Sequence, residues 1–182
     1  MLEDSFGLAL LGIARNAIAD HFGLEIRAIT SNPELESPGA SFVTLTQKGR
    51  LRGCIGSLEA YRALVDDVAA NALAAAFRDS RFAPLTRDEL TITRIEVSLI
   101  EPAVPIDCAD ECEAIAVLRP GVDGVILALG RRRATFLPQV WESLPDPQQF
   151  LTQLKLKAGL PADFWDDEIT LSRYGVRKWK ET

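Results

Sequence analysis

The segment KGRLRGCIGSLE, residues 48–59, constrains the fold of this chain more than any other stretch. Its Lys-Gly pair is a turn signal, and the residues that follow have the pattern of a strand. Glycine loses more conformational freedom on folding than any other residue, so a strand selected only for stability would not carry Gly53 and Gly56 in its interior. Something must therefore approach the backbone closely here, and Cys54 is either its chemical partner or a small core residue.

Side-chain alternation along an extended strand predicts which of these residues share a face. Leu51 and Ile55 are natural core residues, which would leave Arg52 and Cys54 together on the opposite face, roughly 7 Å apart. The two glycines would then open a shallow notch beside the thiol. A two-residue turn at Lys48-Gly49 would place the apolar Val43 beside Cys54, which would make both faces of the sheet partly apolar. Either the sheet is then covered on both faces, or the turn is longer than two residues.

Two interpretations of this strand follow. In the functional one, Arg52 holds an anionic group and stabilises a thiolate, and Cys54 acts as nucleophile or soft metal ligand. Gly53 and Gly56 then give a ligand access to the backbone. In the structural one, Cys54 is a small buried residue and the glycines allow close packing. The only histidine, His21, ends the first predicted helix, where it suits the helix dipole better than the role of a catalytic base.

The rest of the chain mixes helices and strands without a strict βαβ alternation. The hydrophobic patterns predict helices over residues 4–22, 61–79, 109–118 and 146–159, strands over 41–47, 50–57, 90–101 and 168–180, and a hairpin over 121–138. This mixture favours an α+β fold with a mainly antiparallel sheet and helices packed against it. The length of 182 residues suits one domain, residues 1–182, with room for a smaller lobe.

Composition limits the classes of function. The net charge of −6 argues against a general nucleic-acid coat, which needs a basic surface. Three cysteines, an odd number without a disulfide pattern, indicate a reducing compartment, and we expect a cytoplasmic protein. Glu3 and Asp4 precede the first apolar run, unlike the basic start of a signal peptide. No phosphate loop, dinucleotide motif, zinc spacing or cluster ligand set is present, so no cofactor or metal is expected.

Three further groups of residues are candidates for a site. FRDSRF places Arg78, Asp79 and Arg81 after an alanine-rich helix, either as helix termination or as a polar cluster that faces the notch, with Asp79 as an acid or base. The run GRRRATF could clamp phosphate or form a solvated hairpin tip. FLPQVW carries Gln139 and Trp141, and the tryptophan belongs to a core or to the aromatic wall of a ligand cleft.

The motif LRGCIG, residues 51–56, resembles the signature of the AMMECR-type domain family. The blocks GASFVTL, AAAFRDSRFAPL, IEVSLI, DGVILALG, ATFLPQVW and LKAGLP stand around it in the order of that family, so the resemblance covers nearly the whole chain. It implies an α+β fold with a larger and a smaller subdomain and the signature near the cleft between them. The bacterial and archaeal branch is called AmmeMemoRadiSam system protein A, which implies a Memo-like protein and a radical S-adenosylmethionine protein as partners. The resemblance implies no particular reaction.

Three hypotheses for function result. In the first, the signature strand forms a cleft for an anionic small molecule or a modified group, with Cys54, Arg52 and Asp79 as catalytic candidates. Its ligand-binding candidates are Arg52, Gly53, Gly56, Arg78 and Gln139, and the protein is an accessory or catalytic component of the radical-enzyme system. The second is a non-catalytic interaction adaptor. The third, nucleic-acid binding or modification, depends on the arginine run alone.

Overall fold

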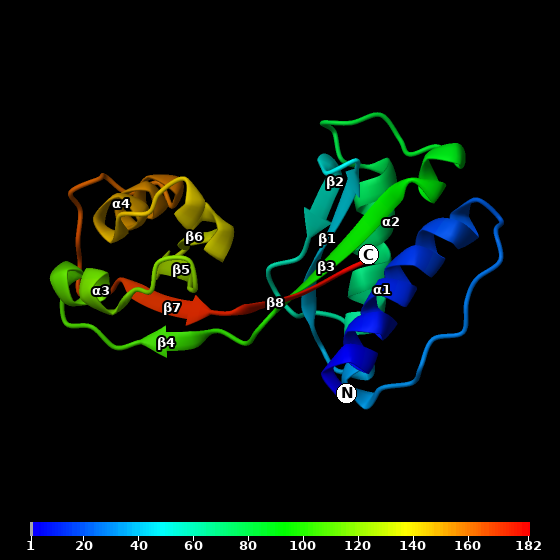
Figure 1. Cartoon of the computed structure of the whole chain (residues 1–182). Coiled ribbons are helices and arrows are strands. Elements are labelled where there is room, and N and C mark those ends of the chain that lie inside the picture. Colours follow the sequence, from blue (N-terminus) through cyan, green and yellow to red (C-terminus); the bar gives the residue numbers. More distant parts are fainter. Residues whose placement is uncertain (1) are drawn as a thin grey trace. The chain divides into compact units, whose positions relative to one another are not determined.

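The computed structural model describes residues 2–182, with side chains from Ser5 onward, and it divides the chain into two compact units (Figure 1). Unit 1 comprises Met1–Ile100 and Arg177–Thr182, and unit 2 comprises Glu101–Val176. Each unit has its own sheet and its own hydrophobic core. The α+β class with a larger and a smaller part is therefore confirmed, although the strands form two sheets.

Unit 1 is a sheet with two long helices against one face. The strand order is β2-β1-β3-β8. The strands are β1 (Ala40–Gln47), β2 (Arg50–Gly56), β3 (Thr93–Ile100) and β8 (Val176–Lys180), and the helices are α1 (Leu2–His21) and α2 (Leu64–Phe77). Val43 and Leu45 on β1 and Ile95 and Val97 on β3 are fully buried in one cluster with the apolar sides of both helices. The odd-numbered residues of β1 and β3 thus face the core.

Unit 2 repeats this plan on a smaller scale, with the strand order β4-β7-β5-β6. Its elements are β4 (Val104–Ile106), α3 (Glu111–Val117), β5 (Gly124–Leu129), β6 (Arg132–Phe136), α4 (Pro147–Lys157) and β7 (Thr170–Tyr174). Trp141 is buried, stacks on Phe150 with ring centroids 3.7 Å apart, and donates its indole N–H to the carbonyl oxygen of Asp123 at 2.7 Å. Trp141 is therefore a core residue of unit 2. No helix in the described part of the chain is long and apolar enough to cross a membrane.

The segment predicted as one final strand is two strands in different sheets. β7 ends at Tyr174 and β8 begins at Val176, with Gly175 between them. A side chain at Gly175 would overlap the carboxylate of Glu101, whose backbone N–H donates to the carbonyl of Gly175 at 3.0 Å. The alternating pattern of residues 168–180 fits both strands, so it carries no sign of the break.

A bulge in the β1–β2 hairpin decides where Cys54 lies. The turn has two residues, Lys48 and Gly49, both with positive φ. The register then shifts between Leu45 and Thr46, so that Cys54 is opposite Thr44 and not Val43. Since Thr44 faces away from the core, Cys54 does so too. Neither of the two expected explanations, a longer turn or a sheet covered on both faces, is needed.

The close approach predicted at Gly53 is made by the protein itself. Gly53 lies opposite buried Leu45, and a Cβ at this position would overlap the carbonyl oxygen of Ala75 in α2. A Cβ at Gly56 would overlap the ring of Phe42. The expected notch beside the thiol is therefore wrong, because these spaces are filled by a helix and a phenyl ring.

We expect Gly53→Ala to destabilise the protein by about 1–3 kcal/mol, because the α2 backbone would have to move away from the sheet. Gly12→Ala in α1 is the matched control, since its Cβ would meet only Ile29 Cγ1 at 3.5 Å. That substitution should stabilise by about 0.5–1 kcal/mol through helix propensity. Urea unfolding measures both, and equal stability of the two variants would contradict the packing role of Gly53.

Candidate functional site

Cys54 lies on an edge strand whose free edge is closed by two side chains. Asp79 Oδ2 accepts the backbone N–H of Cys54 at 2.9 Å, and Arg81 Nη2 donates to the backbone carbonyl of Cys54 at 3.2 Å. The N–H and C=O of Cys54 therefore point away from β1, which makes Cys54 and Thr44 a non-hydrogen-bonded pair with close side chains. Accordingly, Thr44 Oγ1 is 3.3 Å from Cys54 Sγ. The thiol is half-buried and hydrogen-bonded on the outer face of the sheet.

Asp79 and Arg81 form a bidentate ion pair beside this strand. Arg81 Nε donates to Asp79 Oδ1 at 2.9 Å and Arg81 Nη2 to Oδ2 at 2.6 Å. The side chain of Asp79 is 4 % exposed and that of Arg81 is 54 % exposed. The side-chain hydrogen bond from Arg81, with further bonds from the Cys54 and Arg81 backbone N–H groups, holds the pKa of Asp79 far below its ordinary value despite burial.

These contacts change the role predicted for Asp79. A carboxylate with so low a pKa is a weak proton acceptor at neutral pH, so the predicted acid or base is a positioning residue. The hydrogen bond between Asp79 and Arg81 raises the pKa of Arg81. The cation held against the backbone of Cys54 is thus Arg81, which the sequence interpretation had assigned first to helix termination.

Arg52 is committed to another partner. Its Nε and Nη2 donate to the two carboxylate oxygens of Glu89 at 3.0 and 3.1 Å, and its buried Nη1 has no hydrogen-bond partner among the residues that the structure describes. The bulge removes the simple alternation that would have placed Arg52 beside Cys54. The predicted anion-holding role of Arg52 is therefore not supported, since its side chain is paired with Glu89 and is only 14 % exposed.

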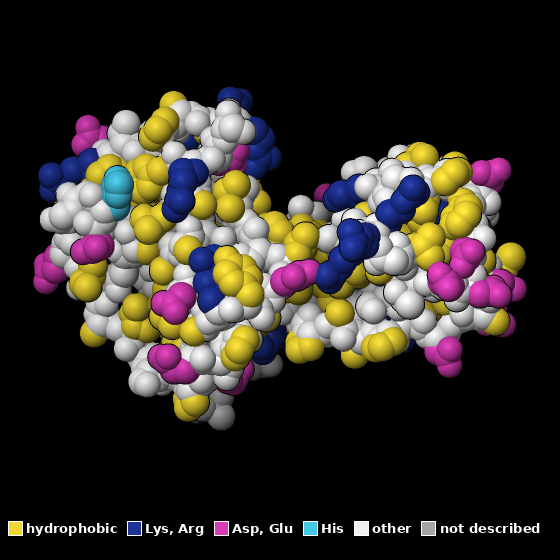
Figure 2. Space-filling model, turned by 180° about the vertical axis from the view of Figure 1, so that it is seen from behind, with side chains coloured by type: hydrophobic (Ala, Val, Ile, Leu, Met, Phe, Trp, Pro, Cys, Tyr) yellow, Lys and Arg dark blue, Asp and Glu magenta, His cyan; other side chains and the backbone are white. Residues whose placement is uncertain are grey.

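The remaining candidates belong to other elements of the two units. The backbone N–H of Arg78 donates to the carbonyl oxygen of Ala74 at the C-terminal end of α2. The exposed side chain of Arg78 makes no ion pair within the described residues. Gln139 is exposed and belongs to unit 2. In the arginine run, Arg132 donates to the carbonyl of Gly159 at 2.6 Å. His21 lies at the surface of unit 1 (cyan in Figure 2), with its ring 4.0 Å from that of Phe77.

The sequence interpretation missed a buried polar network that fastens the same strands. Asp67 of α2 is fully buried, and its two carboxylate oxygens accept from Ser41, Ser57 and Asn71. Arg62 adds an ion pair at 2.9 Å. The sequence signal that could have revealed this network is the pair Asp67 and Asn71. These polar residues are four apart and therefore share one face of an alanine-rich helix. Among the described residues, no group of three or more histidine, cysteine or carboxylate side chains is placed to hold a metal ion.

The Arg52–Glu89 pair should make stability depend on pH. Hydrogen bonding by Arg52, with added bonds from Thr86 and Gln47, lowers the pKa of Glu89 to about 2. A lowered carboxyl pKa stabilises the fold above the unfolded-state pKa of about 4.3, and this contribution is lost as pH falls towards 2. We expect Glu89→Gln to cost about 1–2 kcal/mol at neutral pH and progressively less below pH 4. Urea unfolding across this range measures the effect.

The control for this series is Glu25→Gln, which removes an exposed carboxylate in the same unit. Its cost should be near zero at every pH. A cost of Glu89→Gln that stays constant down to pH 2 would show that the ion pair is not its source.

The comparisons with known proteins agree with this fold. A protein of Methanothermobacter thermautotrophicus is 36% identical over 184 residues, covering 96% of this chain and 94% of its own length. A protein of Saccharolobus islandicus strain L.S.2.15 is 36% identical over 190 residues, covering all of this chain and 84% of its own. The crystal structure of an uncharacterized protein from Pyrococcus horikoshii matches with a TM-score of 0.76 and 30% identity, over 94% of this chain and 89% of that one. The AMMECR1 family model matches residues 11–179, and the chain belongs to the AMMECR1 family.

Proposed function

We propose that the outer face of β2 around Cys54 binds an anionic small molecule or an anionic modified group of a partner. In this role the protein acts as an accessory or catalytic component of a modification system. Arg81 binds the anionic group and Cys54 lies beside it as nucleophile or soft ligand. The supporting observation is that Asp79 fixes Arg81 against the backbone of Cys54 while the Arg81 side chain stays half-exposed.

The fixed geometry favours binding because Arg81 is already ordered. Both Asp79 oxygens hold its guanidinium, so little side-chain entropy is lost when an anion arrives. Asp79 neutralises part of the charge, but it lies on the buried side of the guanidinium.

Cross-strand neighbours give the ligand an orientation. Cys54, Thr44 and Glu96 stand opposite one another on β2, β1 and β3, and they share the outer face. Glu96 is two strands from Cys54, roughly 10 Å away. The anionic end of a ligand belongs at the Arg81 edge, and a neutral or hydrogen-bond-donating end belongs towards Glu96.

Alkylation with a charged and a neutral reagent tests the anion site. We expect the ratio of the iodoacetate rate to the iodoacetamide rate at Cys54 to be about two- to fivefold higher in the wild type than in Arg81→Gln. The reason is that the guanidinium attracts the carboxylate of iodoacetate. Mass spectrometry of the modified peptides gives the rate at each cysteine. Arg81→Lys should keep part of the preference, and added salt should reduce it.

Two references belong to this experiment. Cys112 is exposed in the same molecule and should show an unchanged reagent ratio in Arg81→Gln. Arg87→Gln removes an exposed cation elsewhere in unit 1 and should leave Cys54 unaffected. The same ratio for Cys54 in the wild type and in Arg81→Gln would refute the anion site, even if Cys54 is reactive.

The partners of this proposal are the Memo-like protein and the radical S-adenosylmethionine protein that the family resemblance implies. We expect the tagged chain to retain both when the three proteins are co-expressed, and Arg81→Glu to weaken retention if a modified group of a partner occupies the site. Quantitative co-purification measures this, with Arg87→Glu as the charge control. Equal recovery with Arg81→Glu would restrict the site to small molecules.

A further inference from the structure

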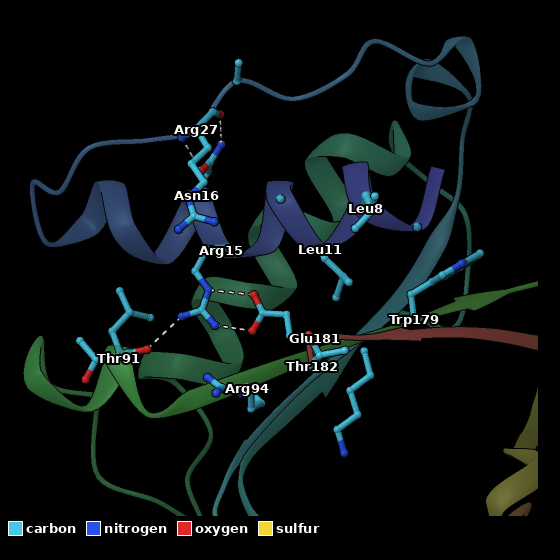
Figure 3. Close-up of a pocket in the computed structure, with 15 residues that line it drawn as sticks. Leu8, Leu11, Arg15, Asn16, Arg27, Thr91, Arg94, Trp179, Glu181 and Thr182 are labelled. Atoms are coloured by element: carbon cyan, nitrogen blue, oxygen red, sulfur yellow. Dashed lines mark hydrogen bonds and ion pairs between the residues drawn. The ribbon is translucent and has the colours of Figure 1, made fainter. Parts of the chain in front are cut away.

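The outer face of the sheet in unit 1 continues from Cys54 across β1 and β3 to β8. The helices α1 and α2 pack on the other, inner face, against the buried residues of β1 and β3. On that inner side, α1 and the end of β8 also line a cavity of about 740 Å³ (Figure 3). Neither helix covers the outer face, so its side chains are the surroundings of any ligand bound at Cys54.

Trp179 shows which way the side chains of β8 point. Its ring packs edge-to-face against that of Phe6 in α1, with centroids 5.6 Å apart, so Trp179 is on the inner face. Strand alternation then places Lys178 and Lys180 on the outer face. Arg94 is on the outer face as well, because the core residues of β3 are the odd-numbered ones.

Hydrogen bonds at the end of β8 fix its register against β3. The backbone N–H of Glu181 donates to the carbonyl of Ile95 at 3.0 Å, and the Glu181 carboxylate accepts the N–H of Ile95 at 2.9 Å. The ion pair of Glu181 with Arg15 of α1 holds this end of the chain in place (Figure 3). The bond between the residues that follow β3 and precede β8 shows that the two strands are antiparallel. Lys180 is therefore opposite Glu96.

One row of side chains thus crosses all four strands of the sheet. Cys54, Thr44 and Glu96 are opposite one another on β2, β1 and β3, and Lys180 extends the row onto β8. Adjacent strands are about 4.8 Å apart, so the backbones at Cys54 and Lys180 are roughly 14 Å apart. Arg81 lies at the β2 end of this row, and Lys180 forms the other end.

The far end of the row has more positive than negative charge. Lys178 and Lys180 of β8 and Arg94 of β3 are exposed, and they make no ion pair within the described residues. Glu96 is opposite only one of these cations and neutralises at most one charge. In a chain of net charge −6, this excess is local, and it lies on the same face as Cys54.

The two groups of cations are too far apart to act on one small anion. The Debye length is about 8 Å at physiological ionic strength, which is shorter than the separation of roughly 14 Å. The lysines of β8 therefore contribute little to an anion held at Arg81. A ligand that uses both ends of the row needs an anionic group at each end.

We propose that the ligand of the Cys54 face is an extended dianion, whose second anionic group binds Lys178 and Lys180. This inference rests on the proposed function, which places the first anionic group at Arg81. The hydrogen-bond-donating part of the ligand then lies at Glu96, and the chain continues past it to β8. The two anionic groups are separated by about 10–15 Å, because three strand spacings lie between their partners.

Alkylating reagents of two lengths test the second site. The short pair is iodoacetate and iodoacetamide, and the long pair is N-iodoacetyl-triglycine and its amide, whose three residues extend about 10 Å. We expect the acid-to-amide rate ratio of the long pair at Cys54 to be about two- to fivefold higher in the wild type than in the double variant Lys178→Gln, Lys180→Gln. The ratio of the short pair should be the same in both proteins, because iodoacetate ends beside Cys54.

The matched control is the double variant Arg27→Gln, Arg87→Gln, which removes two exposed cations of unit 1 that lie outside the strands. Its ratios should equal those of the wild type for both reagent pairs. Cys112 of unit 2 is the internal reference, and its ratios should not change in any variant. An unchanged long-pair ratio in the lysine variant, or an equal loss in the control variant, would overturn the inference. A loss of the short-pair ratio in the lysine variant would do so too, since it shows a diffuse field and no second site.

Protection of Cys54 tests both anionic groups in one molecule. N-succinyl-triglycine has a carboxylate at each end, whereas N-acetyl-triglycine has only one. At equal ionic strength, we expect the first peptide to slow the reaction of Cys54 with iodoacetamide at about fivefold lower concentration than the second. The lysine variant should lose this difference. Equal protection by the two peptides, or protection by neither, would contradict the extended dianion.

The two proposals fail by different results. A short-pair ratio that is unchanged in Arg81→Gln refutes the anion site at Cys54. A long-pair ratio that is unchanged in the lysine variant refutes the second anionic group and leaves the first in place.

Discussion

The contact on which unit 1 depends is the approach of α2 to the backbone of β2 at Gly53. A helix normally rests on the side chains of a sheet, whereas here the carbonyl of Ala75 occupies the volume of a missing Cβ. The alanine side of α2 continues this close packing, and Asp67 of the same helix forms hydrogen bonds with Ser41 and Ser57. The distance between helix and sheet is therefore fixed both by apolar packing and by a buried carboxylate.

This distance also positions the residues around Cys54. Asp79 follows the end of α2 by two residues, and it reaches the N–H of Cys54 only because the helix lies so close to the strand. Arg81 then binds Asp79 and the carbonyl of Cys54. An edge strand needs its free N–H and C=O groups covered to avoid pairing with other chains. The same cover brings a cation to the backbone of Cys54, so protection of the edge and the position of Arg81 have one structural origin.

The sequence predicted the elements better than their pairing. Periodicity and capping signals located the long helices, the β5–β6 hairpin and the Asp146 cap of α4, because these depend on local interactions. The bulge that turns Cys54 towards Thr44 was not predicted, because an interior glycine such as Gly53 is equally compatible with a bulge and with close packing. Glu89 was missed as the partner of Arg52, and Arg81 was placed near Cys54 in only one of two alternatives, for a related reason. These partners are 37 and 27 residues apart along the chain, and only the tertiary fold brings them together.

The return of Arg177–Thr182 to unit 1 has a consequence for synthesis on the ribosome. The first hundred residues provide α1, α2 and three of the four strands, but the fourth emerges only after the whole of unit 2. Until then β3 is an open edge, and the backbone N–H of Ile95 lacks the carboxylate of Glu181 that binds it in the finished protein at 2.9 Å. The nascent chain therefore carries an incomplete sheet through the translation of some seventy-six residues, Glu101–Val176, and closes it only when the β8 segment has been made. A strand of five residues thus ties completion of the first unit to completion of the second.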